Sequence, residues 1–250
     1  METYTYQKCF SENHPELYNF LQREQKAKKI IAVLKDFVKD DLSKLRLLDI
    51  GSSTGIMTNF LSSHFYETTG VDIDEKGIIF SSENFRKDNL NFKVDDAMNL
   101  SFSENSFDIV NCSHIYEHVP DSKRLMDEIY RVLKPGGVCY FAAGNRLVLI
   151  EAHYKLPFLS IIPKWLAHKY IKIFKKADFY YENHLTYWGL KKLVSKFEIY
   201  DYTKKIIKDP VKYFATDMIK PGSFLQYLYL VILNLAYWIC PTYIWILRKK

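Results

Sequence analysis

The sequence predicts an α/β protein with a largely parallel sheet, and two observations carry this prediction. Short apolar runs that suit buried strands alternate with stretches of helical periodicity, from residue 45 to about residue 144. A small-residue loop, Gly51-Ser-Ser-Thr-Gly55, joins the first apolar run to a helix. Ligands bind outside the carboxyl ends of the strands in such sheets. The 250 residues, 48% of them hydrophobic, suffice for a single domain with a sizeable core.

The predicted elements follow one another along most of the chain. Apolar runs bounded by turn residues predict strands at 45–50, 90–94, 107–112, 138–143, 198–207 and 242–247. A further strand, second in the chain, ends at residue 74. Helical spacing predicts helices over 15–38, from the glycine loop to about residue 63, over 76–87, from 121 to about 133, and over 187–197. Asp74 and Asp121 are expected to cap the helices that follow them. Pro135 and the two glycines after it should end the preceding helix.

An acidic residue stands at the predicted carboxyl end of the second strand. Asp72 lies in the segment Val71-Asp-Ile-Asp74, one strand after the glycine loop. A carboxylate there can accept hydrogen bonds from both hydroxyls of a ribose. The loop and the acid together therefore predict a nucleoside site.

The same stretch resembles a known family. Asp49, Gly51 and Gly55 match the acid-x-Gly-x-Gly-x-Gly motif of the class I S-adenosylmethionine-dependent methyltransferases, in their type 11 branch. Several segments between residues 106 and 137 match the same family in the same order, including Ser-Phe-Asp-Ile-Val and Leu-Lys-Pro-Gly-Gly. The resemblance covers about residues 45–144.

This resemblance implies a Rossmann-like seven-stranded sheet with helices on both faces, and S-adenosyl-L-methionine as the cofactor. It also implies one domain over 1–250, with a helical cover at 15–40, a cofactor-binding core at 45–144, a substrate lid at 145–185, a hydrophobic helical insert at 210–240 and a last strand at 242–247. The helical cover can equally be a helix that packs on the sheet. The cofactor-binding residues that the resemblance implies are Asp49, Gly51, Ser53, Gly55, Asp72, Ile73, Asp96, Ala97 and Ser113.

Two of these assignments have a particular basis. Ser53 replaces the middle glycine of the motif, and serine is small enough to suit many loop conformations. In the family, an acid after the third strand accepts a hydrogen bond from the adenine amino group, and Asp96 has that place. Alternatively, Asp95 and Asp96 are ordinary turn residues.

Candidate catalytic residues follow from the chemistry of methyl transfer. The reaction needs an aligned nucleophile and, for a hydroxyl or a protonated nitrogen, a base. His114 and His118 follow the fourth strand, and a helical turn would put them on one side. His184 precedes a predicted helix, and His153 lies in the same half of the chain. Each of these histidines can instead be structural.

The segment that contains His114 and His118 also raises the question of a metal. Some quinone O-methyltransferases of the resembled family carry Glu-x-x-Glu-His here and use it with a divalent metal. This chain has histidine in the first place, as His114-x-x-Glu117-His118. We therefore assign no metal ligands.

An uncharged stretch from Pro221 to Leu247 includes an apolar run at 223–240. A helix that is apolar on every face is either buried or in lipid. Three interpretations stay open: a helix lying on a membrane surface, a buried cover over the substrate cleft, or a membrane span of barely sufficient length. The run and the aromatic lid favour a small apolar, lipid-linked or saccharide-linked acceptor.

Composition sets the remaining expectations. The net charge of +6 is spread along the chain without a dense basic stripe, so we expect no nucleic-acid partner. The four cysteines are scattered and no signal-peptide pattern opens the chain. These features predict a cytoplasmic protein, or one at the cytoplasmic face of a membrane. The acceptor atom and the oligomeric state do not follow from the sequence.

Two rival functions share parts of this pattern. A nicotinamide-dependent dehydrogenase would begin with a similar strand and loop, but its Gly-x-Gly-x-x-Gly pattern fails at positions 53 and 56. A non-catalytic, membrane-associated scaffold that binds the cofactor would keep the same acids. Turnover separates this second rival from an enzyme.

Overall fold

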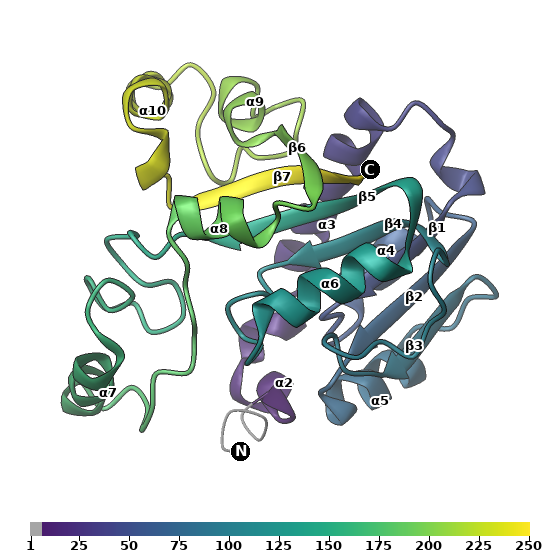
Figure 1. The fold of residues 1–250 in the computed structure, drawn as a ribbon, viewed down its shortest axis with the longest axis horizontal. Coiled ribbons are helices and arrows are strands. Elements are labelled where there is room, and N and C mark those ends of the chain that lie inside the picture. Colours follow the sequence, from purple (N-terminus) through teal and green to yellow (C-terminus); the bar gives the residue numbers. More distant parts are fainter. Residues whose placement is uncertain (1–6) are drawn as a thin grey trace.

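Seven strands form a single mixed sheet in the computed structural model, which describes residues 7–250 (Figure 1). Its order is β3-β2-β1-β4-β5-β7-β6, and β7 runs antiparallel to both neighbours while the other pairs are parallel. The strand order reverses between β1 and β4, the place where ligands bind in such sheets. The predicted fold class is confirmed. The strands are β1 (Arg46–Ile50), β2 (Glu67–Asp72), β3 (Leu90–Val94), β4 (Phe107–Ser113), β5 (Leu133–Gly144), β6 (Phe197–Asp201) and β7 (Thr242–Lys249).

Helices cover both faces of the sheet (Figure 1). Residues of α6 (Ser122–Val132) and α8 (Tyr187–Leu193) pack into the core on one face, and residues of α3 (Phe20–Phe37) and α4 (Ile56–Ser62) into the core on the other. The other helices are α2 (Phe10–Asn13), α5 (Glu75–Asn84), α7 (Lys164–Ile173), α9 (Thr203–Lys208) and α10 (Phe224–Leu235), with short 3-10 turns η1 (Pro15–Tyr18), η2 (Leu42–Lys44) and η3 (Tyr237–Ile239).

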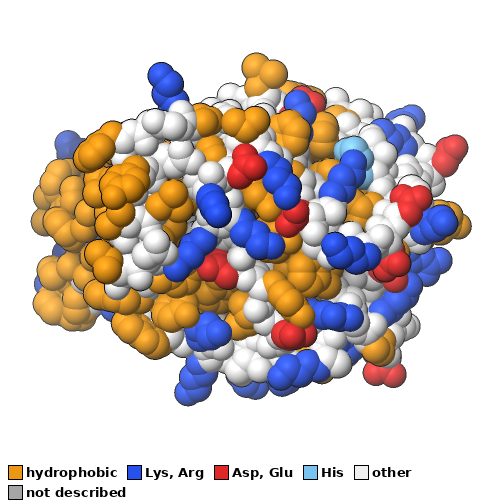
Figure 2. Space-filling view, turned by 90° about the horizontal axis from the view of Figure 1, so that it is seen from above, with side chains coloured by type: hydrophobic (Ala, Val, Ile, Leu, Met, Phe, Trp, Pro, Cys, Tyr) orange, Lys and Arg blue, Asp and Glu red, His pale blue; other side chains and the backbone are white. Residues whose placement is uncertain are grey.

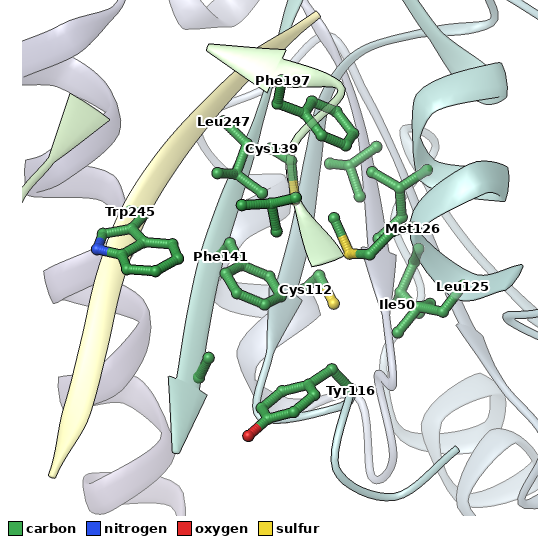
Figure 3. Packing of buried hydrophobic residues seen from close by; sticks show 14 of the residues in the cluster. Ile50, Cys112, Tyr116, Leu125, Met126, Cys139, Phe141, Phe197, Trp245 and Leu247 are labelled. Carbon is green, nitrogen blue, oxygen red and sulfur yellow. The ribbon is translucent and has the colours of Figure 1, made fainter. Parts of the chain in front are cut away.

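The core beneath α6 joins four strands (Figure 3). Ile50, Cys112, Phe141 and Trp245 come from β1, β4, β5 and β7, and each is at most 1% exposed. Leu125 of α6 is also fully buried in this cluster. Burial of one such side chain stabilises the fold by about 1.5–3 kcal/mol. The cluster therefore fixes the relative positions of the strands whose carboxyl ends carry polar residues.

The two predicted helix caps are confirmed, whereas the helices predicted over 76–87 and 187–197 end earlier, at Asn84 and Leu193. Asp74 is the N-cap of α5, where its side chain accepts a hydrogen bond from the Gly77 N–H. Asp121 caps α6 by accepting bonds from two backbone N–H groups of the first turn. α6 ends at Val132, before Pro135 as predicted, but Gly136 lies within β5 and not at the helix end. Its φ is +74°, the left-handed conformation that glycine adopts without a steric cost.

The sixth strand, predicted over 198–207, is shorter in the structure. β6 ends at Asp201, and the rest of the predicted strand forms α9. The Asp201 carboxylate accepts a hydrogen bond from the Thr203 N–H at 2.8 Å, which turns the chain at this point. Tyr202 and Ile206 then point into the core that α3 shares with the sheet. Tyr202 and Ile206 are four residues apart, which is the spacing of one helix turn. The continuous apolar run was equally consistent with a strand.

The apolar run before β7 forms a shorter helix than predicted and is mostly exposed. α10 spans Phe224–Leu235, and only Leu233 within it is buried. Most of the surface of α10 is therefore exposed, and the interpretation of this helix as a buried cover is wrong for that part. Among the described residues, no helix combines the length and apolarity needed to cross a membrane. Figure 2 shows hydrophobic side chains gathered on the flank where α10 lies in Figure 1.

Candidate functional site

A cavity of about 570 Å³ lies at the carboxyl ends of the central strands. Its walls include Gly51 and Ser53 after β1, residues 72–73 at the end of β2, 95–98 after β3 and 113–115 at the end of β4. Side chains of α3 line it as well. Cavities of this size hold cofactors and drug-sized ligands. The predicted position of the site is the position of this cavity.

The loop after β1 brings bare backbone to the cavity wall. Gly51 and Gly55 have φ +74° and +70°, and a Cβ on either would collide with neighbouring side chains. Ser53 adopts φ +50°, a left-handed conformation that costs a residue with a Cβ about 1–2 kcal/mol. This is the conformation that glycine adopts freely, so it accounts for the glycine that the motif has at this place.

Asp72 ties this loop to the end of β2. Its Oδ2 accepts a hydrogen bond from the Ser53 N–H at 2.8 Å, and its Oδ1 accepts one from the Asp74 N–H at 2.9 Å. Burial raises the pKa of Asp72 to about 6, against the lowering effect of these two bonds. Each carboxylate oxygen can accept more than one bond, so Asp72 can also accept hydrogen bonds from a ligand in the cavity.

Asp49 and Asp96 differ in where they lie. Asp49 is buried beneath the loop, where Thr58 and Asn111 each donate a side-chain hydrogen bond to it at 2.6 Å. Burial raises the pKa of Asp49, and its contacts join β1 to α4 and β4. Asp96 lies on the cavity wall, and its Oδ1 accepts a bond from the Met98 N–H at 2.9 Å.

Seven of the nine residues assigned to the cofactor line the cavity. These seven are Gly51, Ser53, Asp72, Ile73, Asp96, Ala97 and Ser113. Asp49 and Gly55 are not part of the described wall, and they shape the loop from below.

Three cationic side chains of α3 were not predicted as part of the site. Arg23, Lys26 and Lys29 line the cavity, and burial lowers the pKa of each. The Arg23 Nε is buried and has no hydrogen-bond partner among the described residues. The nearby carboxylates of Asp49 and Asp72 act to raise the pKa of Arg23. A guanidinium of this kind is suited to bind a ligand carboxylate.

His114 lines the cavity and forms a pair with a buried acid. Its Nδ1 lies 3.2 Å from Glu117 Oε1. Burial acts to raise the pKa of Glu117, but the hydrogen bond from His114 and the neighbouring histidines lower it to about 2. The ionised carboxylate therefore orients the ring. His114 has φ +58°, so the predicted helical turn between His114 and His118 is not present, although both line the cavity.

His118 is packed between aromatic rings on the same wall. Its ring centroid lies 5.2 Å from that of Phe10 and 4.8 Å from that of His153. Burial lowers the pKa of His118 to about 3, so the ring is neutral near pH 7. Its Nδ1 lies 3.9 Å from Glu182 Oε1.

His184 and His153 both approach the buried carboxylate of Glu151. The distance from Glu151 Oε1 is 2.6 Å to His153 Nδ1 and 3.5 Å to His184 Nε2. His153 lines the cavity, whereas His184 is not part of the described wall. Burial acts to lower the pKa of His153, but the Glu151 carboxylate raises it overall. Sequence reasoning named these histidines but missed Glu151 and Glu182, which belong to no recognisable pattern.

Comparisons with known proteins agree with this geometry. Residues 48–141 match the family model described as a methyltransferase domain. A solved S-adenosylmethionine-dependent methyltransferase from Methanosarcina mazei aligns with a TM-score of 0.53 and 25% identity, over 67% of this chain and 85% of that one. Residues 48–141 are a class I methyltransferase domain. S-adenosylmethionine is the cofactor of this family.

Further relatives of the methyltransferase domain cover different parts of the chain. A ubiquinone biosynthesis O-methyltransferase from Coxiella burnetii is 29% identical over 151 residues, which cover 57% of this chain and 60% of that protein. A methyltransferase structure from Mesorhizobium loti aligns over 87% of this chain and 96% of that one, with a TM-score of 0.58 and 16% identity, and so supports the fold. The chain thus spans about 60% of the length of the curated relatives that it matches first.

Proposed function

We propose that this protein transfers the methyl group of S-adenosylmethionine to a hydroxyl oxygen of a small apolar or lipid-linked acceptor. The observation that carries the proposal is one cavity lined by two sets of residues, which we call its two walls. One wall has the glycine loop and the acids of the methyltransferase domain, and the other has histidines backed by buried carboxylates. The first wall suits a nucleoside cofactor, and the second suits removal of a proton from an acceptor.

The residues of the first wall fit the cofactor. Gly51 adds no side chain of its own to the cavity wall, and the Ile115 side chain fills the place where its Cβ would lie. Asp72 would accept hydrogen bonds from the ribose hydroxyls, and Asp96 from the adenine amino group. Arg23 would bind the carboxylate of the methionine part, which gives its unpartnered Nε an acceptor. The cofactor supplies an activated methyl group on a sulfonium.

On the second wall, His114 is the residue best placed to act as a base. Its side chain is about half exposed to the cavity, with an exposure of 47%, and the Glu117 carboxylate holds the ring through Nδ1. The other ring nitrogen is then available to accept the proton of an acceptor hydroxyl. His118 and His184 are more deeply buried, with side-chain exposures of 13% and 6%. They suit a supporting role behind the reacting atoms.

We propose further that the acceptor is apolar, because the molecule carries an exposed apolar surface on α10. Phe224, Leu225, Tyr227 and Leu235 of α10 are each at least 60% exposed. The side chains of Trp165, Leu166 and Ile173 of α7 are also exposed, and the same helix carries three lysines. In Figure 1, α7 and α10 both lie on the left flank of the ribbon. An apolar patch edged with lysines suits an anionic membrane surface.

Vesicle binding tests this part of the proposal. The protein should sediment with vesicles of phosphatidylcholine and phosphatidylglycerol, and a Leu225→Asp/Leu235→Asp variant should stay in the supernatant. Ile79→Asp is a matched control, because Ile79 is also half exposed but lies on α5, away from the patch. Equal sedimentation of all three proteins would remove the membrane surface from the proposal.

Transfer itself is tested with cofactor labelled on its methyl group. The purified protein and a lysate that lacks this gene are incubated together, and the products are divided between organic and aqueous phases. Label in the organic phase supports an apolar or lipid-linked acceptor, and label only in the aqueous phase contradicts it. The His114→Gln variant should transfer far less label while it binds the cofactor as tightly as the wild type. Cofactor binding without any labelled product would instead support a non-catalytic scaffold.

A further inference from the structure

Three histidines and three glutamates form a cluster beside the cavity, in which the glutamates are buried and the histidines partly buried: His118, His153, His184, Glu117, Glu151 and Glu182. Within it, His118, His153 and Glu182 each offer one ligand atom, and these three atoms all lie within 4.8 Å of one another. His118 follows β4, whereas the other two belong to the segment between β5 and α8. The fold therefore brings together ligands that are 64 residues apart in the chain.

The hydrogen bond of His153 fixes which of its nitrogens is available. Glu151 Oε1 lies 2.6 Å from His153 Nδ1, and Glu151 also accepts the backbone N–H of His153 and of Tyr154. A ring that donates its Nδ1–H to a carboxylate has a lone pair on Nε2. This is the carboxylate–histidine arrangement that orients histidine ligands in metal sites.

The other two members have polar atoms without partners. His118 Nδ1 and Glu182 Oε2 are both buried and have no hydrogen-bond partner within the described part of the chain. Glu182 is 1% exposed, and its Oε1 receives a long hydrogen bond from the Tyr154 hydroxyl at 3.4 Å. A buried carboxylate oxygen without a partner is costly, by several kcal/mol. A bound cation would remove that cost.

The buried carboxylates of the cluster also favour a bound cation. Glu117, Glu151 and Glu182 are each at most 1% exposed. Among the described residues, every ion pair that these carboxylates form is with a histidine, and none is with a lysine or an arginine. A divalent ion bound here would balance the charge of these buried carboxylates.

We propose that His118, His153 and Glu182 bind a divalent transition-metal ion at the acceptor end of the cavity, with Glu151 as the positioning residue for His153. Two imidazoles and one carboxylate form a ligand set of Zn²⁺ and of similar ions, whereas Mg²⁺ prefers oxygen ligands. Ligands about 2.1 Å from a tetrahedral ion lie about 3.4 Å apart. The distance from His118 Nδ1 to Glu182 Oε1 is 3.9 Å, so a small side-chain movement closes the site.

A fourth coordination position would face the cavity, because His118 and His153 both line it. This part rests on the proposed function. The ion would bind the acceptor oxygen and make its hydroxyl more acidic. The hydroxyl proton would pass to His114, the oxygen would form a bond to the methyl carbon, and the bond from that carbon to sulfur would break. The sulfonium charge is lost as the thioether leaves.

Metal binding is tested without cofactor or acceptor. The full-length protein is dialysed against EDTA, the chelator is removed, and Co²⁺ is titrated while visible absorption is recorded. We expect saturation at one ion per chain, displacement by Zn²⁺, and no displacement by the same concentration of Mg²⁺. Glu182→Gln and His153→Gln should weaken Co²⁺ binding at least tenfold, and Glu151→Gln about 10–100-fold. His64→Gln is the control, because His64 lies at the end of α4, outside the cluster.

The result that would overturn the site is Co²⁺ binding that is absent, or equally strong in Glu182→Gln, His153→Gln and His64→Gln. Thermal unfolding of each variant shows whether a loss of binding reflects a loss of fold, and Glu182→Gln keeps the size of the side chain. Calorimetry of S-adenosylmethionine binding in EDTA is measured separately. A failed metal titration with intact cofactor binding refutes the metal site alone, whereas absent cofactor binding refutes the proposed function.

Discussion

Replacement of Asp72 separates its two suggested roles, binding the ribose and holding the glycine loop. In the proposed function its carboxylate accepts two hydrogen bonds from the cofactor, and hydrogen bonds to a charged group contribute about 1.5–3 kcal/mol each. Asp72→Ala should therefore cost about 3–6 kcal/mol of binding free energy, which is about 10²–10⁴-fold in Kd. Asp72→Asn keeps one acceptor oxygen and should lose less.

The same substitution also removes the acceptor for the Ser53 and Asp74 N–H groups. Leaving these partly buried donors without a partner should lower the free energy of unfolding by about 1–3 kcal/mol. Calorimetry with S-adenosylmethionine measures the first effect, and urea denaturation measures the second.

Asp74→Asn is the matched control for Asp72. It weakens the cap of α5, at a cost of about 1 kcal/mol or less in stability, but its side chain is not part of the described cavity wall. Its cofactor affinity should equal that of the wild type. If Asp72→Ala binds the cofactor as well as Asp74→Asn does, Asp72 does not bind the ribose, and its role is confined to the loop.

Three further predictions concern the same wall. Because the pKa of Asp72 is about 6, its carboxylate takes up a proton as the pH falls through 6, and cofactor affinity measured by calorimetry should drop about tenfold between pH 7 and pH 5; a flat profile would contradict this. Arg23→Gln should weaken cofactor binding about 10–100-fold with little change in Tm, and unchanged affinity would exclude a bond to the cofactor carboxylate. Gly51→Ala should lower stability by more than Gly222→Ala, since both have positive φ but only Gly51 has side-chain atoms where a Cβ would lie; equal losses of Tm would show that backbone strain alone matters.

The sequence identified those parts of the site that adjoin strands. An acid after a short apolar run has a defined place in a parallel sheet, so Asp72 could be placed before the structure was known, and the family resemblance placed Asp96. The fold class followed for the same reason. Arg23 could not be found this way, because an arginine on an amphipathic helix looks like any solvated surface residue.

The buried carboxylates were hidden for a different reason. Glu151 and Glu182 lie in the segment between β5 and α8, where one short helix provides the only regular element among the described residues. Their burial depends on contacts with His118 and His184, and these contacts form only after the chain has folded. The exposure of α10 could not be predicted from the sequence either, because an all-apolar helix has no polar face that distinguishes its solvent side from its buried side.

The position of β7 has a consequence for how the protein is made. β7 lies between β5 and β6 and carries Trp245 and Leu247, which are fully buried, yet it is the last strand in the sequence. About 100 residues separate it from β5, so at 5–20 residues per second the ribosome takes roughly 5–20 s to supply it. During that time one edge of β5 lacks its β7 partner, with which Cys139 and Phe141 later pair at Leu247 and Trp245. The nascent chain should therefore be open to chaperones over this interval, and shortening the protein before residue 242 should leave it insoluble rather than merely less active.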